Sequence, residues 1–342
     1  MTPLVTVVVV SWNGLSLLRR CLPPVLAQRG VPYEVIVVDN GSSDGSLDWL
    51  RRLSATMAAS PVAPPLRILA SERNLGFAAG NNLAIRESQA PFIATLNNDA
   101  WPEPDCLAAL VAAAESDPSI GSCAAQLVFA SRPEVVNSAG IALDRAGIAW
   151  DREVGAARHP PGPATEVFGA SAGAALYRRA MLDDVGLFAE SFFMYLEDVD
   201  LAWRARLRQW QCVYVPAAVV RHLHSASAGE GSPFKLWHLG RNKLAVLVRC
   251  LPGRPLLRYG GAIVGYDLAA TLLALLARQD ASGVRGRWAA LRRWRELATE
   301  RRQIQSQRTA TWNDVSAWIE PVPTPVEVWR RFRHLRAVLA SV

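Results

Sequence analysis

The sequence has few cysteines, and they follow no pattern that would bind zinc or form a disulfide framework. The five cysteines are scattered and odd in number, without a C-x-x-C pair. The N-terminus also lacks a basic segment before its apolar run, Leu4 to Val10. These absences argue against a zinc module and against a secreted, disulfide-stapled domain. A reducing cytoplasm fits best, and the apolar run is expected to be a buried strand and not a signal peptide.

Charged residues are also scarce, at 20% of the chain, whereas hydrophobic residues make up 51%. This balance excludes a disordered chain, and 342 residues can form one large α/β domain with an appendage. The net charge is +7, and arginines crowd the segment from Arg278 to Arg302, which predicts an acidic partner. Nucleic acid is not expected, because no aromatic and basic platform or recognition helix accompanies the arginines. An anionic membrane surface is the better candidate.

Short β-branched runs alternate with helical patterns in the first hundred residues. Apolar runs at 5–10, 35–38, 66–69 and 92–96 predict strands that are covered on both faces. Apolar residues between Leu15 and Gln28 recur at helical spacing, so the order is strand, helix, strand. The sequence therefore predicts an α/β fold with a doubly wound, mostly parallel sheet.

Beyond Ser232 the composition changes to the helix formers Leu, Ala and Arg, which predicts a helical, basic appendage over residues 232–342. The stretch from Gly260 to Ala277 is apolar apart from Asp267. It is shorter than the ~20 residues that spanning a membrane needs, and arginines flank it. We expect a helix that lies in the membrane interface. The alternative is an ordinary helix packed on the core.

Acidic and small residues follow the second predicted strand, in the run from Asp39 to Ser46. The carboxyl ends of strands are where a doubly wound sheet binds its ligand. Asp39 can accept a hydrogen bond from a pyrimidine N–H or a ribose hydroxyl. Asp44 has two interpretations of about equal weight, a ligand contact and the N-cap of the next helix.

Candidate metal ligands follow two other predicted strands. Asn97, Asn98 and Asp99 come after the strand at 92–96. A hard divalent cation such as Mg²⁺ or Mn²⁺ prefers oxygen ligands and often takes only one or two from protein. Asp99 suits that role, although an Asp in a turn after a strand is common. His222 and His224 alternate after a later strand and project to one side, but two histidines alone are a poor metal signal.

Three carboxylates stand within four positions, Glu197, Asp198 and Asp200, beside an aromatic run. Such clustering at low dielectric raises the pKa of at least one carboxyl, a usual way to prepare a general base. Acids are also favoured at a helix N-terminus by the helix dipole. The two interpretations are compatible, with one acid acting as base and another stabilising the helix.

A basic helix face is expected farther along the chain. Such a face could hold a pyrophosphate group through charge-assisted hydrogen bonds. Its residues are His238, Arg241, Asn242 and Lys243.

These motifs resemble the inverting glycosyltransferase family 2 with the GT-A fold, and within it the bacterial rhamnosyltransferase-like members. The resemblance covers roughly Val5 to Pro252, and five motifs in the same order make it specific. They are Val7 to Asn13, Val37 to Gly45, Asn74 to Asn82, Leu96 to Asp99 and Phe193 to Leu201. One departure is Asn97, which stands at the first acidic position of the family's D-x-D pattern and removes a charge from it.

The resemblance implies a GT-A domain over residues 1–231, with a nucleotide-binding part at about 1–105 and an acceptor-binding part at about 106–231. It implies that Asp39 reads the base and that Asp198 deprotonates the acceptor hydroxyl. It also implies that Asp99 binds Mg²⁺ or Mn²⁺ with His222, or with His224 as its substitute. The residues expected to contact the nucleotide sugar are Asn13, Asp39, Asp44, Asn74, Gly80, Asn97, Asn98, Asp99 and Arg241. Those expected to contact the acceptor are Gly169, Glu197 and Asp200.

The function that the resemblance implies is transfer of a sugar, with rhamnose a candidate, from a dTDP- or UDP-sugar with inversion. The acceptor is a glycan or a lipid-linked glycan of the cell envelope, and the enzyme is cytoplasmic and peripheral on the inner face of the membrane. A nucleotidyltransferase is one alternative, but it needs a Gly-rich basic signature near the first strand, which Ser11 to Gly14 is not. A non-catalytic scaffold is another, and the presence of the acids favours an enzyme.

Overall fold

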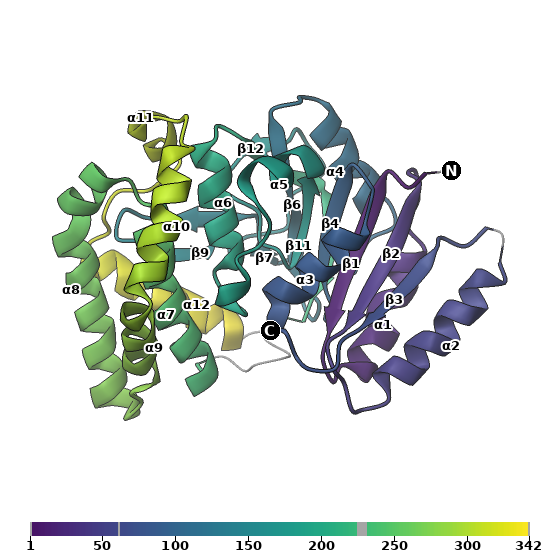
Figure 1. Ribbon diagram of the computed structural model, residues 1–342, viewed down its shortest axis with the longest axis horizontal. Helices are drawn as coiled ribbons and strands as arrows, with labels where there is room; N and C mark the ends of the chain where they lie inside the picture. Colours follow the sequence, from purple (N-terminus) through teal and green to yellow (C-terminus); the bar gives the residue numbers. More distant parts are fainter. Residues whose placement is uncertain (1, 61, 224–230, 341–342) are drawn as a thin grey trace.

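The computed structural model describes residues 2–60, 62–223 and 231–340. Its N-terminal part alternates strands and helices, as expected (Figure 1). Four strands lie parallel in the order β3-β2-β1-β4. Every residue of β2 is buried, which explains its continuous apolar run. The elements are β1 (Val5–Ser11), α1 (Leu15–Leu26), β2 (Tyr33–Asp39), α2 (Ser46–Ala58), β3 (Leu66–Ala70), α3 (Gly76–Glu87) and β4 (Phe92–Asn97).

The rest of the sheet is mixed. Strand β11 runs antiparallel between β4 and β6, and β6 pairs in parallel with β12. Among the described residues ten strands form one sheet along the path β10-β12-β6-β11-β4-β1-β2-β3, with β5 on β12 and β7 on β6. The predicted α/β fold with a doubly wound, mostly parallel sheet is confirmed. The elements are β5 (Ala100–Pro102), α4 (Cys106–Glu115), β6 (Ile120–Phe129), β7 (Val136–Ser138), β8 (Ile141–Leu143), β9 (Ala149–Asp151), β10 (Thr165–Glu166), β11 (Ala174–Arg178), α5 (Arg179–Val185), the 3₁₀ helix η1 (Glu190–Phe192), α6 (Glu197–Leu207) and β12 (Gln211–His222).

Helices cover both faces of this sheet. Leu18 of α1 and Leu107 of α4 belong to the apolar core on one face, whereas Ile85 of α3 and Leu201 of α6 belong to the core on the other. Each fully buried side chain of this size contributes ~1.5–3 kcal/mol. The covering helices leave the carboxyl ends of the parallel strands as the edge at which a ligand can approach.

The C-terminal third is built from helices that pack beside α6. Helix α7 begins where the composition changes, because Ser232 Oγ accepts a hydrogen bond from the backbone N of Lys235 and Pro233 occupies the first turn. Trp203 of α6 and Val246 of α7 share an apolar cluster with residues of α8 and α10. The helices are α7 (Pro233–Cys250), α8 (Gly253–Arg278), α9 (Ser282–Arg292), α10 (Trp294–Ser306), α11 (Trp312–Ser316) and α12 (Pro325–Ala340).

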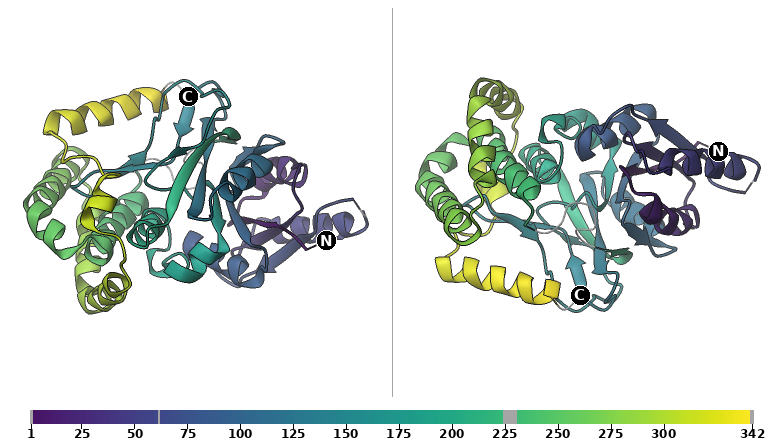
Figure 2. Two further views of the ribbon diagram at one scale, coloured as in Figure 1. Left: turned by 90° about the horizontal axis from the view of Figure 1, so that it is seen from above. Right: turned by 90° about the horizontal axis from the view of Figure 1, so that it is seen from below.

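Helix α12 runs apart from the other C-terminal helices and returns toward the two short strands β8 and β9 (Figure 2). The guanidinium of Arg331 lies 3.9 Å from the centre of the Trp150 ring, and His334 lies 2.8 Å from the carbonyl of Val154. These contacts hold α12 against β9 and the turn that follows it.

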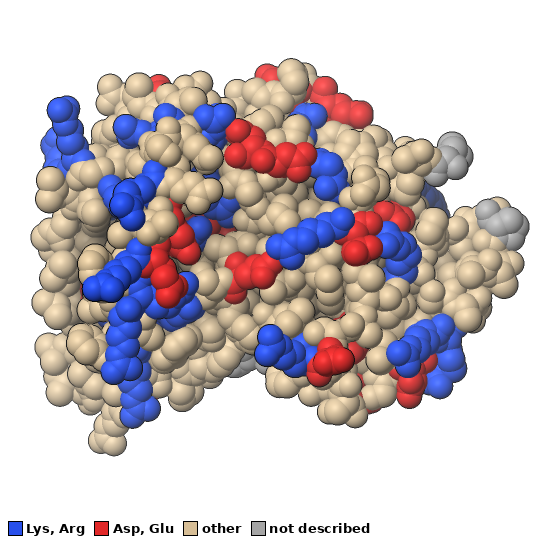
Figure 3. Space-filling model, viewed as in Figure 1, with Lys and Arg blue, Asp and Glu red and all other residues tan. Residues whose placement is uncertain are grey.

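Helix α8 is longer than the apolar run that the sequence suggested. The stretch Gly253–Leu276 is long and apolar enough to cross a membrane by length and composition, yet only 6% of its apolar window is buried. Asp267 faces the protein, where it pairs with Lys243 at 2.9 Å and Arg287 at 3.2 Å. Helix α8 thus packs on the protein along one side only and leaves most of its apolar window exposed. Lys and Arg gather over α9 and α10, beside the largely uncharged surface of α8 (Figure 3). The exposed apolar residues of α8 include Leu257, Val264, Leu268, Leu272, Leu273 and Leu276.

The close contact of α3 with β1 depends on Gly80. A Cβ at this position would come within 2.7 Å of Cγ1 of Val10, so Gly80→Ala should lower the free energy of unfolding by ~1–3 kcal/mol, the usual cost of overpacking. Gly260→Ala is the matched control, because nothing lies within 4 Å of a Cβ at Gly260 in α8. There the substitution should raise stability by ~0.5–1 kcal/mol. Urea denaturation measures both, and shifts of the same sign would contradict the steric explanation.

Candidate active site

The ends of three neighbouring strands bring the polar motifs together. Strand β1 lies between β2 and β4, with Ser11 opposite Asp39 and Val10 opposite Asn97. Asn98 joins this edge by donating a hydrogen bond from its Nδ2 to Ser11 Oγ at 2.9 Å. The sequence motifs that follow β2 and β4 therefore meet on either side of β1.

Asp39 is buried with only part of its carboxylate satisfied. Its Oδ1 accepts a hydrogen bond from the backbone N of Ser42 at 3.0 Å. Its Oδ2 is buried without a hydrogen-bond partner among the described residues. A buried acceptor left without a donor is costly. The position therefore suits a ligand that offers an N–H or O–H group, as the sequence led us to expect.

Asn13 and Asp44 brace the loops at this edge. Asn13 Oδ1 accepts a hydrogen bond from the backbone N of Ser43 at 2.8 Å. Asp44 accepts from the backbone N of Leu15 at 2.9 Å and of Ser46 at 3.0 Å, at the starts of α1 and α2. The N-cap residue of α2 is Gly45, so Asp44 stands one position before the cap and not at the N-cap position that one interpretation gave it. Contacts of either residue with a nucleotide stay predictions.

Two residues of the third motif shape α3. Asn74 Oδ1 accepts hydrogen bonds from Asn40 Nδ2 at 3.0 Å and from the backbone N of Gly76 at 2.9 Å. Gly80 is buried against Val10 of β1. Gly80 therefore has a packing role in this structure, and its expected contact with the nucleotide sugar stays a prediction.

An Asp–His pair follows β4 and ends β12. Asp99 Oδ1 lies 3.2 Å from His222 Nε2, and Asn97 Nδ2 lies 3.5 Å from the same nitrogen. His222 Nδ1 lies 2.7 Å from Asn137 Oδ1, an acceptor that favours a proton on Nδ1. One oxygen and one nitrogen donor are a suitable protein contribution for a divalent cation whose other ligands are phosphate and water.

The pair does not belong to a larger metal cluster within the described residues, where no three His, Cys, Asp or Glu side chains gather. His224, the expected substitute for His222, lies outside the described residues.

The turn before β11 connects this pair to the acidic start of α6. The backbone N of Asn97 donates to the carbonyl of Gly173 at 2.9 Å. One residue earlier, the backbone N of Ala172 donates to Asp198 Oδ2 at 3.2 Å. The carboxylate expected to act as a base therefore stands beside the strand end that carries Asp99.

Burial shifts the titration of the first two acids of α6. Burial raises the pKa of Asp198 to about 6, although the hydrogen bond from Ala172 lowers it. Burial and the charge of Asp198 raise the pKa of Glu197 well above its usual range. Glu197 is 6% exposed, and its Oε2 has no hydrogen-bond partner among the described residues. Of the two carboxyls, Asp198 remains the candidate base, because the pKa of Glu197 is raised further by the charge beside it.

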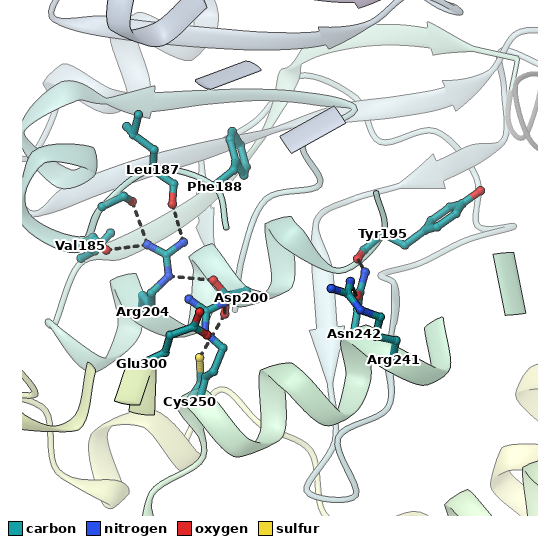
Figure 4. Close-up of polar contacts among 12 residues, drawn as sticks. Val185, Leu187, Phe188, Tyr195, Asp200, Arg204, Arg241, Asn242, Cys250 and Glu300 are labelled. Carbon is teal, nitrogen blue, oxygen red and sulfur yellow. Dashed lines mark hydrogen bonds and ion pairs between the residues drawn. The ribbon is translucent and has the colours of Figure 1, made fainter. Parts of the chain in front are cut away.

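The third acid, Asp200, has a different environment. It is fully buried, accepts a hydrogen bond from Arg204 Nε at 2.8 Å and pairs with Arg249 Nη1 at 2.7 Å (Figure 4). Both oxygens of Asp200 face arginines inside the protein, and its expected acceptor contact stays a prediction. Gly169 packs closely, since a Cβ there would meet the Cβ of Ala202 at 2.4 Å, and its acceptor contact also stays a prediction.

Arg241 lies on α7, with its guanidinium 5.4 Å from the centre of the Trp237 ring and Nη1 donating to Asn242 Oδ1 at 3.0 Å. Burial lowers its pKa, and nearby Arg293 of α10 lowers it further. These contacts attach Arg241 to the C-terminal helices, so its pyrophosphate contact stays a prediction.

Sequence reasoning missed Asn137 and the turn at Ala172. Both lie in a region of short strands where no periodic pattern marks a site. An asparagine next to a short apolar run carries no metal signal of its own, and Ala172 takes part only through its backbone.

Comparison with known families and proteins agrees with the geometry. Residues 6–186 match the family profile described as Glycosyl transferase family 2. N-acetylglucosaminyl-diphospho-decaprenol L-rhamnosyltransferase of Mycobacterium tuberculosis is 28% identical over 254 residues, 67% of this chain and 79% of that protein. The uncharacterized protein y4gI of Sinorhizobium fredii is 27% identical over 249 residues, 68% of this chain. The chain spans only 26% of the length of that second relative.

Solved structures resemble the chain in fold. Mannosyltransferase PcManGT from Pyrobaculum calidifontis, in complex with GDP-Man and Mn²⁺, superimposes with a TM-score of 0.54 at 21% identity, over 90% of this chain and 86% of that one. GalNAc-T7 with UDP, GalNAc and Mn²⁺ gives a TM-score of 0.58 at 15% identity, over 72% of this chain and 48% of that one. The expected GT-A fold is confirmed.

Proposed function

Since this chain belongs to glycosyl transferase family 2, we propose that it transfers a sugar from a nucleoside diphosphate sugar to a hydroxyl acceptor with inversion. The observation that carries the proposal is the proximity of Asp198 to the Asp99 strand end. The two are joined through the backbone of residues 172–173. A base and a site for the leaving diphosphate are the two requirements of such a reaction.

The donor that we propose is a dTDP- or UDP-sugar, with rhamnose a candidate sugar. The unsatisfied Oδ2 of Asp39 supports a pyrimidine or ribose contact. The acceptor that we propose is a glycan or lipid-linked glycan of the cell envelope. Its support is the mycobacterial relative, which is named for rhamnosyl transfer to an N-acetylglucosaminyl-diphospho-decaprenol.

In the proposed mechanism the acceptor oxygen attacks the anomeric carbon from the face opposite the nucleoside diphosphate. Asp198 takes the proton from the attacking hydroxyl as the new glycosidic bond forms and the bond to the diphosphate breaks. Glu197, protonated beside it, keeps the second charge away from the same place. No covalent sugar–enzyme intermediate is required, because one displacement inverts the anomeric centre.

Asp99 and His222 would hold a divalent cation, Mg²⁺ or Mn²⁺, with Asn97 beside them. When bound, the cation offsets the negative charge that develops on the departing diphosphate. Because Asn97 replaces an acid, the site has one negative charge fewer. This favours a cation that enters together with the diphosphate.

Nucleotide binding tests the donor and the metal together. The nucleotide should raise the melting temperature in thermal-shift assays with dTDP, UDP and GDP, and Mn²⁺ should increase the shift, because a ligand of the native state stabilises it. Asp99→Ala should remove most of the Mn²⁺ dependence. Asn137→Ala leaves both ligands in place and should weaken Mn²⁺ affinity ~10- to 100-fold by releasing the His222 ring. Asn97→Ala should do less than Asp99→Ala. Equal shifts with and without Mn²⁺ in the natural protein would contradict the metal site.

Asp198→Asn should lower the rate of transfer ~10²- to 10⁴-fold, because it removes the proton acceptor with little change of shape. Nucleotide binding and the melting temperature should stay near those of the natural protein. In the natural protein kcat/KM should rise about tenfold per pH unit below 6 and level off above it, since Asp198 acts as the carboxylate and its pKa is raised to about 6. A flat profile from pH 5 to 8, or normal turnover of the variant, would make Glu197 the next candidate.

For location, we propose that the enzyme sits on the cytoplasmic face of a membrane, held in the interface by α8 and the helices beside it. The exposed leucines of α8 supply an apolar surface. Arg292 lies over Trp288 at 5.6 Å and Arg295 over Trp294 at 5.4 Å, and such pairs suit the headgroup region of an anionic leaflet.

Flotation with liposomes tests this placement. We expect binding to anionic but not to neutral vesicles, weakened by salt, because attraction by basic residues is screened. Leu272→Glu with Leu276→Glu should abolish binding, whereas Val62→Glu, at a 91% exposed residue of the N-terminal part, should not. Salt-resistant retention would indicate a spanning helix. Absence of binding to either vesicle would refute the membrane proposal.

A further inference from the structure

The segment that leads into α6 has an unusual backbone. Phe193, Tyr195 and Leu196 all have positive φ angles, 66°, 69° and 65°. Residues with side chains rarely adopt this conformation, and it persists only where the surroundings impose it. The segment ends one residue before Glu197 and two before Asp198. Its conformation therefore decides where the proposed base begins its helix.

One side chain of α7 holds this segment from the C-terminal side. Asn242 is fully buried, and its Nδ2 donates to the backbone carbonyls of Phe192 at 3.1 Å and Met194 at 2.9 Å. It also donates to the carbonyl of Tyr195 at 2.8 Å (Figure 4). The two amide hydrogens of this side chain are thus shared among three backbone carbonyls, which face α7 because of the positive φ angles of the segment. His238, one turn earlier on α7, stacks on the Phe193 ring at 5.6 Å and 20°.

The start of α3 holds the same segment from the nucleotide side. The backbone N of Phe77 donates to the carbonyl of Phe193 at 2.7 Å, and that of Ala78 donates to it at 3.2 Å. Gly76 leaves room for the Phe193 ring, since a Cβ there would lie 2.5 Å from its Cδ2. The segment is therefore hydrogen-bonded to α3 on one side and to α7 on the other.

A second attachment fixes the first turn of α6 to the same appendage. Asp200 pairs with Arg249 near the end of α7, and Arg249 Nε lies 3.0 Å from Glu300 of α10. Helix α7 therefore contacts both the loop before Asp198 and the residue two positions after it.

We propose that Asn242 is a positioning residue for the base, so that α7 is part of the transfer machinery. Asn242 orders the backbone at 192–196 and thereby sets the direction in which Asp198 presents its carboxylate to the acceptor hydroxyl. It does not bind pyrophosphate, since its amide hydrogens are committed to three carbonyls inside the protein. The inference rests on the proposed function, because it names what supports the base of that reaction.

The test compares substitutions at two residues of the appendage whose side-chain amides both donate hydrogen bonds to backbone carbonyls. Asn242→Asp keeps the shape and loses the donors, Asn242→Ala loses both, and Asn242→Ser is a milder variant that keeps one donor. Gln305→Ala is the matched control, because Gln305 Nε2 donates to the carbonyls of Arg249 and Cys250 at the far end of α7. Measurements are kcat, the KM for the donor, the melting temperature, and amide hydrogen exchange at Phe77 and Ala78.

We expect kcat to fall ~10- to 100-fold in Asn242→Asp and Asn242→Ala, and less in Asn242→Ser, because a small misplacement of a reacting group has an effect of this size. The donor KM should stay within about twofold of the natural value, and exchange at Phe77 and Ala78 should become faster as the Phe193 carbonyl loses its fixed place. Gln305→Ala should change none of these quantities.

A normal kcat in folded Asn242 variants would overturn the inference, as would a raised donor KM with unchanged kcat. Equal losses in Gln305→Ala would overturn it as well, because they would indicate general loosening of the appendage. If Asn242→Asp and Asn242→Ala do not fold, Asn242→Ser decides by the same criteria. Absence of transfer by the natural protein would instead refute the proposed function, and hydrogen exchange would still report whether Asn242 orders the segment.

Discussion

Three carboxyl groups at the start of the buried helix α6 must be stabilised with little help from water. One is stabilised by ion pairs, and the other two have raised pKa values. Asp200 is compensated by Arg204 and Arg249 inside the protein. The pKa values of Glu197 and Asp198 are instead raised, mainly by burial. The acids within these four positions of sequence therefore have two different environments. Because Arg249 lies on α7, its loss would leave the buried carboxylate of Asp200 without one of its two partners.

The antiparallel strand β11 also shapes the candidate site. Parallel strands alone would gather Asp39 and Asn97 at one edge, but the proposed base comes from a later part of the chain. The antiparallel insertion of β11 beside β4 carries the turn at Ala172 and Gly173 to that edge. There the carbonyl of Gly173 accepts a hydrogen bond from the backbone N of Asn97, and the backbone N of Ala172 donates to the Asp198 side chain at the start of α6. The contact uses no side chain of the turn, which makes it insensitive to the identity of its residues.

Periodicity and strand-end position predicted much of this arrangement, since both depend on local sequence. The apolar runs of β1 and β2, and the polar residues Asp39 and Asp99 that follow strands, lie where the pattern placed them. The division of labour between Asp198 and Asp200 was not predictable, because Arg249 reaches Asp200 from a helix far along the chain. The role of a glycine is ambiguous in the sequence for a related reason. A glycine such as Gly80 indicates that some group approaches the backbone closely, whether a ligand or another side chain. Only the packing of α3 on β1 shows that Val10 approaches Gly80 in this structure.

Helix α7 joins the two regions that the proposed function needs. Asn242 faces inward to the loop before the base, while its neighbour Lys243 faces Asp267 of α8. Lys243 and Arg287 neutralise Asp267 on the protein side, so α8 can present apolar residues outward without an unpaired charge. Crossing the bilayer would break both ion pairs and place a carboxylate in hydrocarbon, at a cost of ~2.5–3.5 kcal/mol or more for the charge alone. An interfacial position keeps those pairs. In this proposed position α7 would also stay attached to α8, so packed helices and not a flexible tether would set the distance between the lipid surface and Asp198.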